Sequence, residues 1–274
     1  MSEREYVLGT GNDELARLAQ QHRLWSNTAH EAWLRAGLHP GQRVLDVGAG
    51  PGFAAFDLAQ LATGSGRVVA VDESAGFVGH CNEQASRRGL PQLAAKVGDV
   101  QRLGDTLGAE APFDLAYARW VLCFVKDPEA VVRGVAKALR PGGAFVVHDY
   151  FNYGAMTMAP RRRSHDLAVA ATMQSWRANG GDPDVMGRVP AMLVAHGFRI
   201  EHMVAHQRIA RGSDAMFAWP DTWWRTFAPK LVTMGLLQAA DCAELLRDLD
   251  AIRASESAFV VCPAVYEIVA RRIA

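Results

Sequence analysis

The feature that most restricts the fold is residues 44–53, where a short apolar run leads directly into Gly-Ala-Gly-Pro-Gly. The apolar run predicts a buried strand, and the renewed periodicity over 53–61 predicts a helix. Glycines at the alternate positions 48, 50 and 52 allow a sharp turn and a close approach of the backbone to a ligand, where a Cβ would collide. A strand, a glycine turn and a helix in this order are typical of the ligand-binding edge of an open α/β sheet.

Strands alternate with helices through the first half of the chain. Asp127 and Pro128 open one of the helices as its N-cap and first-turn proline. This alternation predicts an α/β fold with a doubly wound, seven-stranded, mostly parallel sheet. The expected strands are 43–47, 68–71, 93–97, 113–118, 144–147, 198–209 and 260–271, and the expected helices include 12–36, 53–61 and 75–88.

The composition changes near residue 150. Eight of the nine methionines and four of the seven tryptophans follow it, in segments that look like helical insertions. We therefore expect an N-terminal helical lid, a ligand-binding core, a helical cap made of two insertions, and the last strands of the core. The corresponding residues are 1–40 for the lid, 41–150 for the core, 151–183 and 212–256 for the cap, and 184–211 and 257–274 for the last strands.

Charge and composition exclude several classes of function. The 29 basic and 29 acidic residues give a net charge of zero, which does not favour nucleic acid as a partner. No apolar run approaches the roughly 20 residues that span a bilayer, and residues 1–10 lack a signal pattern, so we expect a cytoplasmic protein without a membrane partner. The four cysteines are scattered, which supports neither a metal site nor a disulfide framework.

The glycine turn differs from the nucleotide-binding turns that it superficially matches. A dinucleotide fingerprint would place its third glycine at position 53, which is Phe53, and no Gly-Lys-Ser/Thr of a P-loop follows. Acidic residues at the strand ends, Asp46 and Asp72, argue against a bound phosphate. A carboxylate can accept two hydrogen bonds from a ribose diol, so these acids suit a neutral nucleoside.

Five motifs follow one another in order: Asp46 with the three glycines, Asp72, Asp99 with Val100, the segment 113–122, and the segment 139–143. Together they resemble the class I S-adenosylmethionine-dependent methyltransferases, specifically the small-molecule branch similar to the ubiquinone/menaquinone methyltransferases. The resemblance implies a Rossmann-like methyltransferase fold and S-adenosyl-L-methionine as cofactor, with Asp72 on the ribose hydroxyls and Asp99 beside the adenine. The cofactor-binding residues that it implies are Asp46, Gly48, Ala49, Gly50, Gly52, Phe53, Asp72, Glu73, Ser74, Asp99, Val100, Arg119 and Trp120.

The crevice of an open α/β sheet lies at the carboxyl ends of its strands, which places Arg119, His148 and Asp149 near the transferred methyl group as candidate catalytic residues. His148 is the simplest general base, because its ordinary pKa is about 6.5. Strand alternation lets only one of His148 and Asp149 face the cleft, and the pattern does not say which one. The alternative for His148 is a packed strand histidine.

The cap is expected to bind the acceptor. Methionine repacks easily and tryptophan offers a broad contact area, so the cap predicts an adaptable apolar pocket, although these side chains could equally form the core of the cap. Tryptophans on its surface would also suit a homodimer contact. The substrate-binding candidates are Tyr150, Met156, Trp176, Trp219 and Trp223.

Two further groups have open interpretations. Tyr6, His22 and Trp25 of the lid are candidates to close over the methionine part of the cofactor, against ordinary core packing. The run Arg161 to Arg163 suits either an anionic substrate group or a solvated helix start.

The sequence therefore predicts methyl transfer to O, N or C of a small, largely apolar or aromatic metabolite by in-line displacement, with no metal. Two alternatives remain on the same cofactor fold. One is an enzyme that catalyses a rearrangement, and the other is a cofactor-binding protein without catalytic activity.

Overall fold

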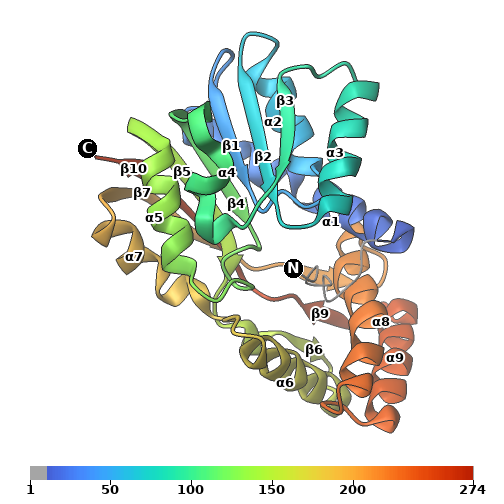
Figure 1. Ribbon diagram of the computed structural model, residues 1–274. Coiled ribbons are helices and arrows are strands. Elements are labelled where there is room, and N and C mark those ends of the chain that lie inside the picture. The colour runs from blue at the N-terminus through green and yellow to red at the C-terminus, as the bar shows by residue number, and fades with distance from the viewer. Residues whose placement is uncertain (1–10, 274) are drawn as a thin grey trace.

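The computed structural model describes residues 11–273 and is built on a seven-stranded sheet of order β3-β2-β1-β4-β5-β10-β7 (Figure 1). Strands β1 to β5 run parallel to one another, and β10 runs antiparallel to both of its neighbours. The expected doubly wound, mostly parallel sheet is thus confirmed. The strands are β1 (Arg43–Val47), β2 (Arg67–Asp72), β3 (Leu93–Val97), β4 (Phe113–Arg119), β5 (Leu139–Tyr150), β7 (Phe198–His206) and β10 (Val265–Arg272).

Helices cover both faces of this sheet. On one face α1 (Asn12–Arg35), α2 (Phe53–Ala62) and α3 (Ala75–Arg87) share a hydrophobic cluster with the strands. On the other face lie α4 (Leu103–Leu107), α5 (Pro128–Ala138) and α7 (Val189–Ala195). The predicted cap of α5 is present, since the Asp127 carboxylate accepts a 2.9 Å hydrogen bond from the backbone N–H of Ala130.

The cap lies beyond the carboxyl ends of β4 and β5 (Figure 1). It contains α6 (Arg163–Ala178), α8 (Ala218–Thr233) and α9 (Ala239–Ala254), with α8 packed against α9. It also contains an antiparallel three-stranded sheet of order β6-β9-β8, which the sequence did not predict. These short strands are β6 (Thr157–Ala159), β8 (Ile209–Arg211) and β9 (Phe259–Val261).

The small sheet corrects two strand predictions. The expected strands 198–209 and 260–271 are each interrupted, at 207–208 and at 262–264, and their outer ends pair as β8 with β9 instead of joining the large sheet. The backbone N–H of Cys262 still donates to the Arg208 carbonyl at 2.9 Å, so the two segments stay paired across the interruption. Because the twofold side-chain period also continues, the sequence pattern gives no sign of the change of sheet.

Among residues 11–273, no helix is long and apolar enough to cross a membrane.

Candidate functional site

The glycine turn after β1 has the backbone that its sequence requires. Gly48, Gly50 and Gly52 all have positive φ, at 67°, 54° and 89°. A Cβ on Gly48 would lie 2.5 Å from the side chain of Val121, and one on Gly52 would overlap the Cys81 sulfur. The turn therefore needs glycine at these two positions both for its conformation and for space.

Asp72 is fixed at the end of β2 beside this turn. Its Oδ2 accepts a 2.7 Å hydrogen bond from the Gly50 N–H, and its Oδ1 accepts one of 2.9 Å from the Ser74 N–H. Burial raises the pKa of the Asp72 carboxyl, while these two backbone donors oppose the rise. Ser74 itself caps α3, because its hydroxyl accepts from the N–H of Phe77.

A cavity of about 230 Å³ opens at the carboxyl ends of the strands, between the glycine turn and the cap. Sixteen of the predicted site residues line it: Asp46, Gly48, Ala49, Gly50, Phe53, Asp72, Glu73, Asp99, Val100, Arg119, Trp120, Tyr150, Met156, Trp176, Trp219 and Trp223. Gly52 and Ser74 do not line it. They begin α2 and α3 and so shape the wall from behind.

Two opposite charges in this wall each keep a buried atom without a partner in the described part of the chain. These atoms are Oδ2 of Asp46 and Nη1 of Arg119. Burial raises the pKa of the Asp46 carboxyl to about 7, with Arg119 opposing the rise and Asp72 adding to it. A buried polar group without a hydrogen bond is costly, so the pair is suited to a ligand that carries both an ammonium and a carboxylate.

Asp99, which follows β3, also lines the cavity. Its Oδ1 accepts hydrogen bonds from the backbone N–H of Gln101 at 2.9 Å and from the side-chain amide of the same residue at 3.1 Å. Phe77, Val100 and Gln101 line the cavity beside Asp99 and give this end both an apolar surface and a polar one. Sequence reasoning missed Phe77 and Gln101.

His22 of helix α1 contacts a residue of the cavity wall, Arg119. The Arg119 guanidinium donates to Nδ1 of His22 at 3.0 Å, so His22 carries its proton on Nε2, which lies 3.0 Å from a carboxylate oxygen of Asp57. Burial lowers the pKa of His22, with Arg119 acting in the same direction and Asp57 opposing. His22 therefore links the lid to a cavity residue.

None of the predicted lid residues in the described part of the chain lines the cavity, and His22 reaches its wall only through Arg119. Trp25 is buried, with its ring 4.9 Å from that of Trp219 and 5.7 Å from that of Trp120, and Tyr6 lies outside the described residues. Sequence reasoning instead missed Arg17, Leu18 and Gln21 of α1, which line the cavity. Their one-face spacing of three and four residues was the available signal.

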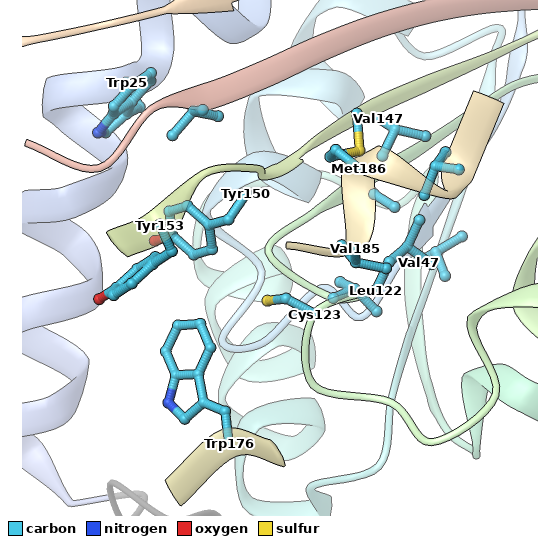
Figure 2. Packing of buried hydrophobic residues seen from close by; sticks show 14 of the residues in the cluster. Trp25, Val47, Leu122, Cys123, Val147, Tyr150, Tyr153, Trp176, Val185 and Met186 are labelled. Atoms are coloured by element: carbon cyan, nitrogen blue, oxygen red, sulfur yellow. The ribbon is translucent and has the colours of Figure 1, made fainter. Parts of the chain in front are cut away.

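The cap end of the cavity is aromatic. The ring of Trp120 stacks on those of Tyr150 and Trp219, with centroids 6.1 and 5.8 Å apart. Tyr150, Tyr153 and Trp176 lie together as a second group (Figure 2), with 5.1 Å between the centroids of Tyr153 and Trp176. Sequence reasoning did not select Tyr153, Phe124, Pro220 or Pro263, which also line this end.

Asp149, a predicted catalytic residue, lies outside the cavity lining. It is 1% exposed, and its carboxylate accepts hydrogen bonds from the backbone N–H groups of Val121, Cys123 and Tyr150 at 3.2, 3.2 and 2.9 Å. Burial raises its pKa to about 6, and the hydrogen bonds that it accepts act against this rise. Asp149 thus holds the turn after β4 that carries part of the cavity wall.

His148, the predicted base, is also 1% exposed and outside the lining. Its Nε2 lies 3.1 Å from Oε2 of Glu267, and its Nδ1 lies 3.3 Å from the hydroxyl of Tyr117. Strand alternation predicts that only one of His148 and Asp149 faces the cleft, but neither side chain lines the cavity. The structure places each against buried partners, on opposite faces of the sheet.

Glu267 contacts several basic side chains in this buried region. His148, His206 and Glu267 bring three ligand-type atoms within 4.8 Å of one another. Arg35 of α1 forms an ion pair with the same carboxylate. The Glu267 charge is thus already balanced by side chains of the chain itself.

The basic run Arg161 to Arg163 does not line the cavity. Arg162 and Arg163 pair with Asp248 and Asp241 at 3.4 and 3.3 Å, which joins α6 to α9.

Comparison with known proteins places the chain in a family. A family model described as a methyltransferase domain matches residues 38–207, more than half of the chain. The chain belongs to this methyltransferase family. S-adenosyl-L-methionine is the cofactor, and the wall described above fits it, because the unpartnered Asp46 and Arg119 atoms and the glycine cradle suit its amino-acid and nucleoside parts.

Named methyltransferases resemble this chain over about half of its length. The 2-phytyl-1,4-naphtoquinone methyltransferase of Synechococcus elongatus is 36% identical over 132 residues, which are 47% of this chain and 53% of that one. The ubiquinone/menaquinone biosynthesis C-methyltransferase of Cellvibrio japonicus is 29% identical over 130 residues, 47% of this chain and 50% of that one. The chain thus spans about half the length of these two relatives.

The fold is shared with solved methyltransferase structures. Phosphoethanolamine N-methyltransferase 2 of Haemonchus contortus aligns with a TM-score of 0.56 and 16% identity, over 90% of this chain and 52% of that one. The family and the fold, together with the placement of the cavity, are the basis for the proposals that follow.

Proposed function

We propose that this protein transfers the methyl group of S-adenosyl-L-methionine to O, N or C of a small, largely apolar or aromatic metabolite. The observation that carries the proposal is the division of one cavity into two ends. Charged strand-end residues such as Asp46, Asp72 and Arg119 form one end, and aromatic residues of the cap form the other.

At the charged end, the chain's own groups match the parts of the cofactor. Asp72 would accept hydrogen bonds from the two ribose hydroxyls with the lone pairs that its backbone donors leave free. Asp99 and Val100 border the adenine. Asp46 would bind the ammonium group and Arg119 the carboxylate of the methionine part, which would satisfy both unpartnered atoms.

At the aromatic end, Trp120, Tyr150, Trp176, Trp219 and Trp223 bind the acceptor by stacking and apolar contact, and Met156 fills the space left around it. In this arrangement the described part of the predicted lid, 11–40, covers the cofactor, and the cap segments 151–183 and 212–256 hold the acceptor. The expected homodimer and the cytoplasmic location stay predictions.

The cofactor supplies an electrophilic methyl group. The protein needs to hold the acceptor in line with the methyl–sulfur bond and to keep water out. The buried aromatic wall and the lid contact between His22 and Arg119 serve both requirements. Among the alternatives, the deep aromatic cavity beside the cofactor wall argues against a binding protein without an acceptor pocket, and no observation specifically favours a rearrangement.

The test is calorimetric titration with S-adenosylmethionine and S-adenosylhomocysteine of the wild-type protein, of Asp72→Ala, and of Asp105→Ala. Asp105 is an exposed residue of α4 outside the cavity and serves as the matched control. We expect micromolar binding that is lost only in Asp72→Ala.

A tritiated-methyl assay with phenols, naphthols, quinols and aromatic amines then identifies the acceptor. Absence of binding by the wild-type protein would refute the cofactor site. Binding without transfer to any aromatic class would refute the acceptor assignment.

A further inference from the structure

A row of polar side chains crosses the buried face of the sheet next to α1. Tyr117 on β4 lines the cavity, although it is fully buried from bulk solvent. Its hydroxyl lies 3.3 Å from Nδ1 of His148 on β5, and Nε2 of His148 lies 3.1 Å from Glu267 on β10. Three adjacent strands thus join the cavity wall to a buried carboxylate.

The hydrogen-bond directions in this row follow from the chemistry of its members. Burial raises the pKa of the Glu267 carboxyl, but His148, His206 and Arg35 together hold it well below its usual range. Nε2 of His206 lies 2.9 Å from Glu267, and Arg35 forms an ion pair with it. An ionised carboxylate only accepts, so His148 carries its proton on Nε2.

Burial lowers the pKa of His148, which keeps its imidazole neutral and leaves Nδ1 as an acceptor. The Tyr117 hydroxyl must therefore donate to His148.

This arrangement would destabilise the fold if it served only for packing. Burying these polar groups costs free energy that an apolar row of the same size would not. Aromatic packing surrounds the phenol end of the row, where the ring of Trp33 lies 5.1 Å from that of Tyr117, while Arg35 and His206 contact its carboxylate end. The order phenol, imidazole, carboxylate matches the logic of a catalytic triad, in which a carboxylate orients a histidine that receives a proton from a hydroxyl.

We propose that Tyr117 takes the proton of the methyl acceptor and passes its own hydroxyl proton to His148, which Glu267 orients. This rests on the proposed methyltransferase function and narrows the acceptor to one with an O–H or N–H group. Tyr117 is then the catalytic residue, and His148 and Glu267 are positioning residues that act through it.

The step balances without any further reactant. The acceptor uses an electron pair to form the bond to the methyl carbon, and the electrons of the methyl–sulfur bond stay on sulfur. The acceptor proton goes to the Tyr117 oxygen as the Tyr117 proton goes to Nδ1 of His148. The products are the methylated acceptor, a neutral thioether and an imidazolium paired with the Glu267 carboxylate. Burial raises the pKa of Tyr117 and Arg119 opposes that rise, so the phenol keeps its proton until His148 accepts it.

The first arm of the test needs no acceptor. Long-range ¹H–¹⁵N spectra of the labelled protein with S-adenosylhomocysteine at pH 7.5 should show His148 with a protonated Nε2 and a hydrogen-bonded, unprotonated Nδ1. Tyr117→Phe should move the Nδ1 resonance to that of a free acceptor nitrogen. Tyr266→Phe, a half-buried tyrosine of β10 outside the cavity, should leave it unchanged. A protonated Nδ1 in the wild-type protein would overturn the proposal, because His148 could then not accept from Tyr117.

The second arm measures methyl transfer to the acceptor that the tritium assay identifies. Loss of a general base typically costs about 10²–10⁴-fold, so kcat should fall at least about 100-fold in Tyr117→Phe, with the KM of the acceptor within about threefold of wild type. Glu267→Gln should give a smaller fall in kcat with the cofactor Kd retained. The control is His196→Gln, at a half-buried histidine that ends α7 and pairs with Glu129 outside the cavity, and it should have no effect. An unchanged kcat in Tyr117→Phe would overturn the relay while leaving the proposed function intact. Wild-type protein that binds the cofactor but methylates nothing would instead refute the function itself.

Discussion

Asp46 predicts a specific pH dependence of cofactor binding. Its side chain is about 2% exposed, and its Oδ2 has no partner within the described residues, which is why burial raises its pKa to about 7 in the free protein. If the ammonium group of the cofactor binds this carboxylate, binding selects the ionised form. With a pKa near 7, about half of the molecules are ionised at pH 7 and about 3% at pH 5.5.

The Kd of S-adenosylmethionine should therefore rise about 15-fold between pH 7.0 and pH 5.5. Asp46→Asn should bind about 10- to 100-fold more weakly at pH 7, the range expected for loss of a charge-assisted hydrogen bond, and its Kd should vary little over the same interval. Calorimetry at constant ionic strength measures both quantities, with Asp105→Asn as the control.

The free protein should respond in the opposite direction. The pKa of Asp46 is raised from 3.8 in its ordinary state, so its contribution stabilises the fold at acid pH and is lost as the pH rises from about 4 to about 7. Urea denaturation of the wild-type protein and Asp46→Asn measures this difference. A wild-type Kd independent of pH, or a pH dependence that persists in Asp46→Asn, would refute the assignment and point to another group such as His22.

Three further predictions concern stability. Gly52→Ala, whose new Cβ would overlap Cys81, should lower the melting temperature and abolish cofactor binding, whereas Gly50→Ala, with open space and only strain of about 1–3 kcal/mol, should be milder; equal effects in thermal denaturation would contradict the steric argument. His165→Leu should stabilise the protein by about 1–3 kcal/mol in urea denaturation, because neither ring nitrogen has a partner in the described structure. Burial lowers the pKa of His165 from 6.5 to about 4, so the wild-type protein should lose stability as the pH falls between those values, and the variant should lose less. Asp149→Asn should cost about 2 kcal/mol or more in the same assay, since its carboxylate accepts three backbone N–H groups, and a neutral result would show that the turn does not depend on it.

The features that sequence reasoning predicted well are local ones. The glycine turn and the cap at Asp127 depend on residues a few positions apart, and there the pattern and the backbone agree. The strand-end acids Asp46 and Asp72 follow from the same logic, because a parallel sheet brings its carboxyl ends to one edge whatever the details of packing. Their roles as cofactor ligands stay predictions.

The features that it missed depend on partners far along the chain. His148 contacts Glu267, which lies 119 positions later in the chain, and no residue close to His148 in the sequence indicates that contact. Tyr117 has the pattern of one more buried strand residue, although it lines the cavity and its hydroxyl lies 3.3 Å from Nδ1 of His148. In the cap, the period of two persists where β7 gives way to β8, so a change of sheet leaves no mark on the hydrophobic pattern.

The insertion of β10 between β5 and β7 has a consequence for the order in which the molecule can be assembled. Within the large sheet β7 has β10 as its strand neighbour, and the chain must traverse β8, α8, α9 and β9 before β10 is reached. Until then β5 and β7 each present an unpaired edge, which is a template for wrong pairing with other chains. Pairing over such a separation is slow. The β5–β10–β7 side of the sheet should thus be the last part to form on the ribosome or during refolding, and the part most exposed to aggregation.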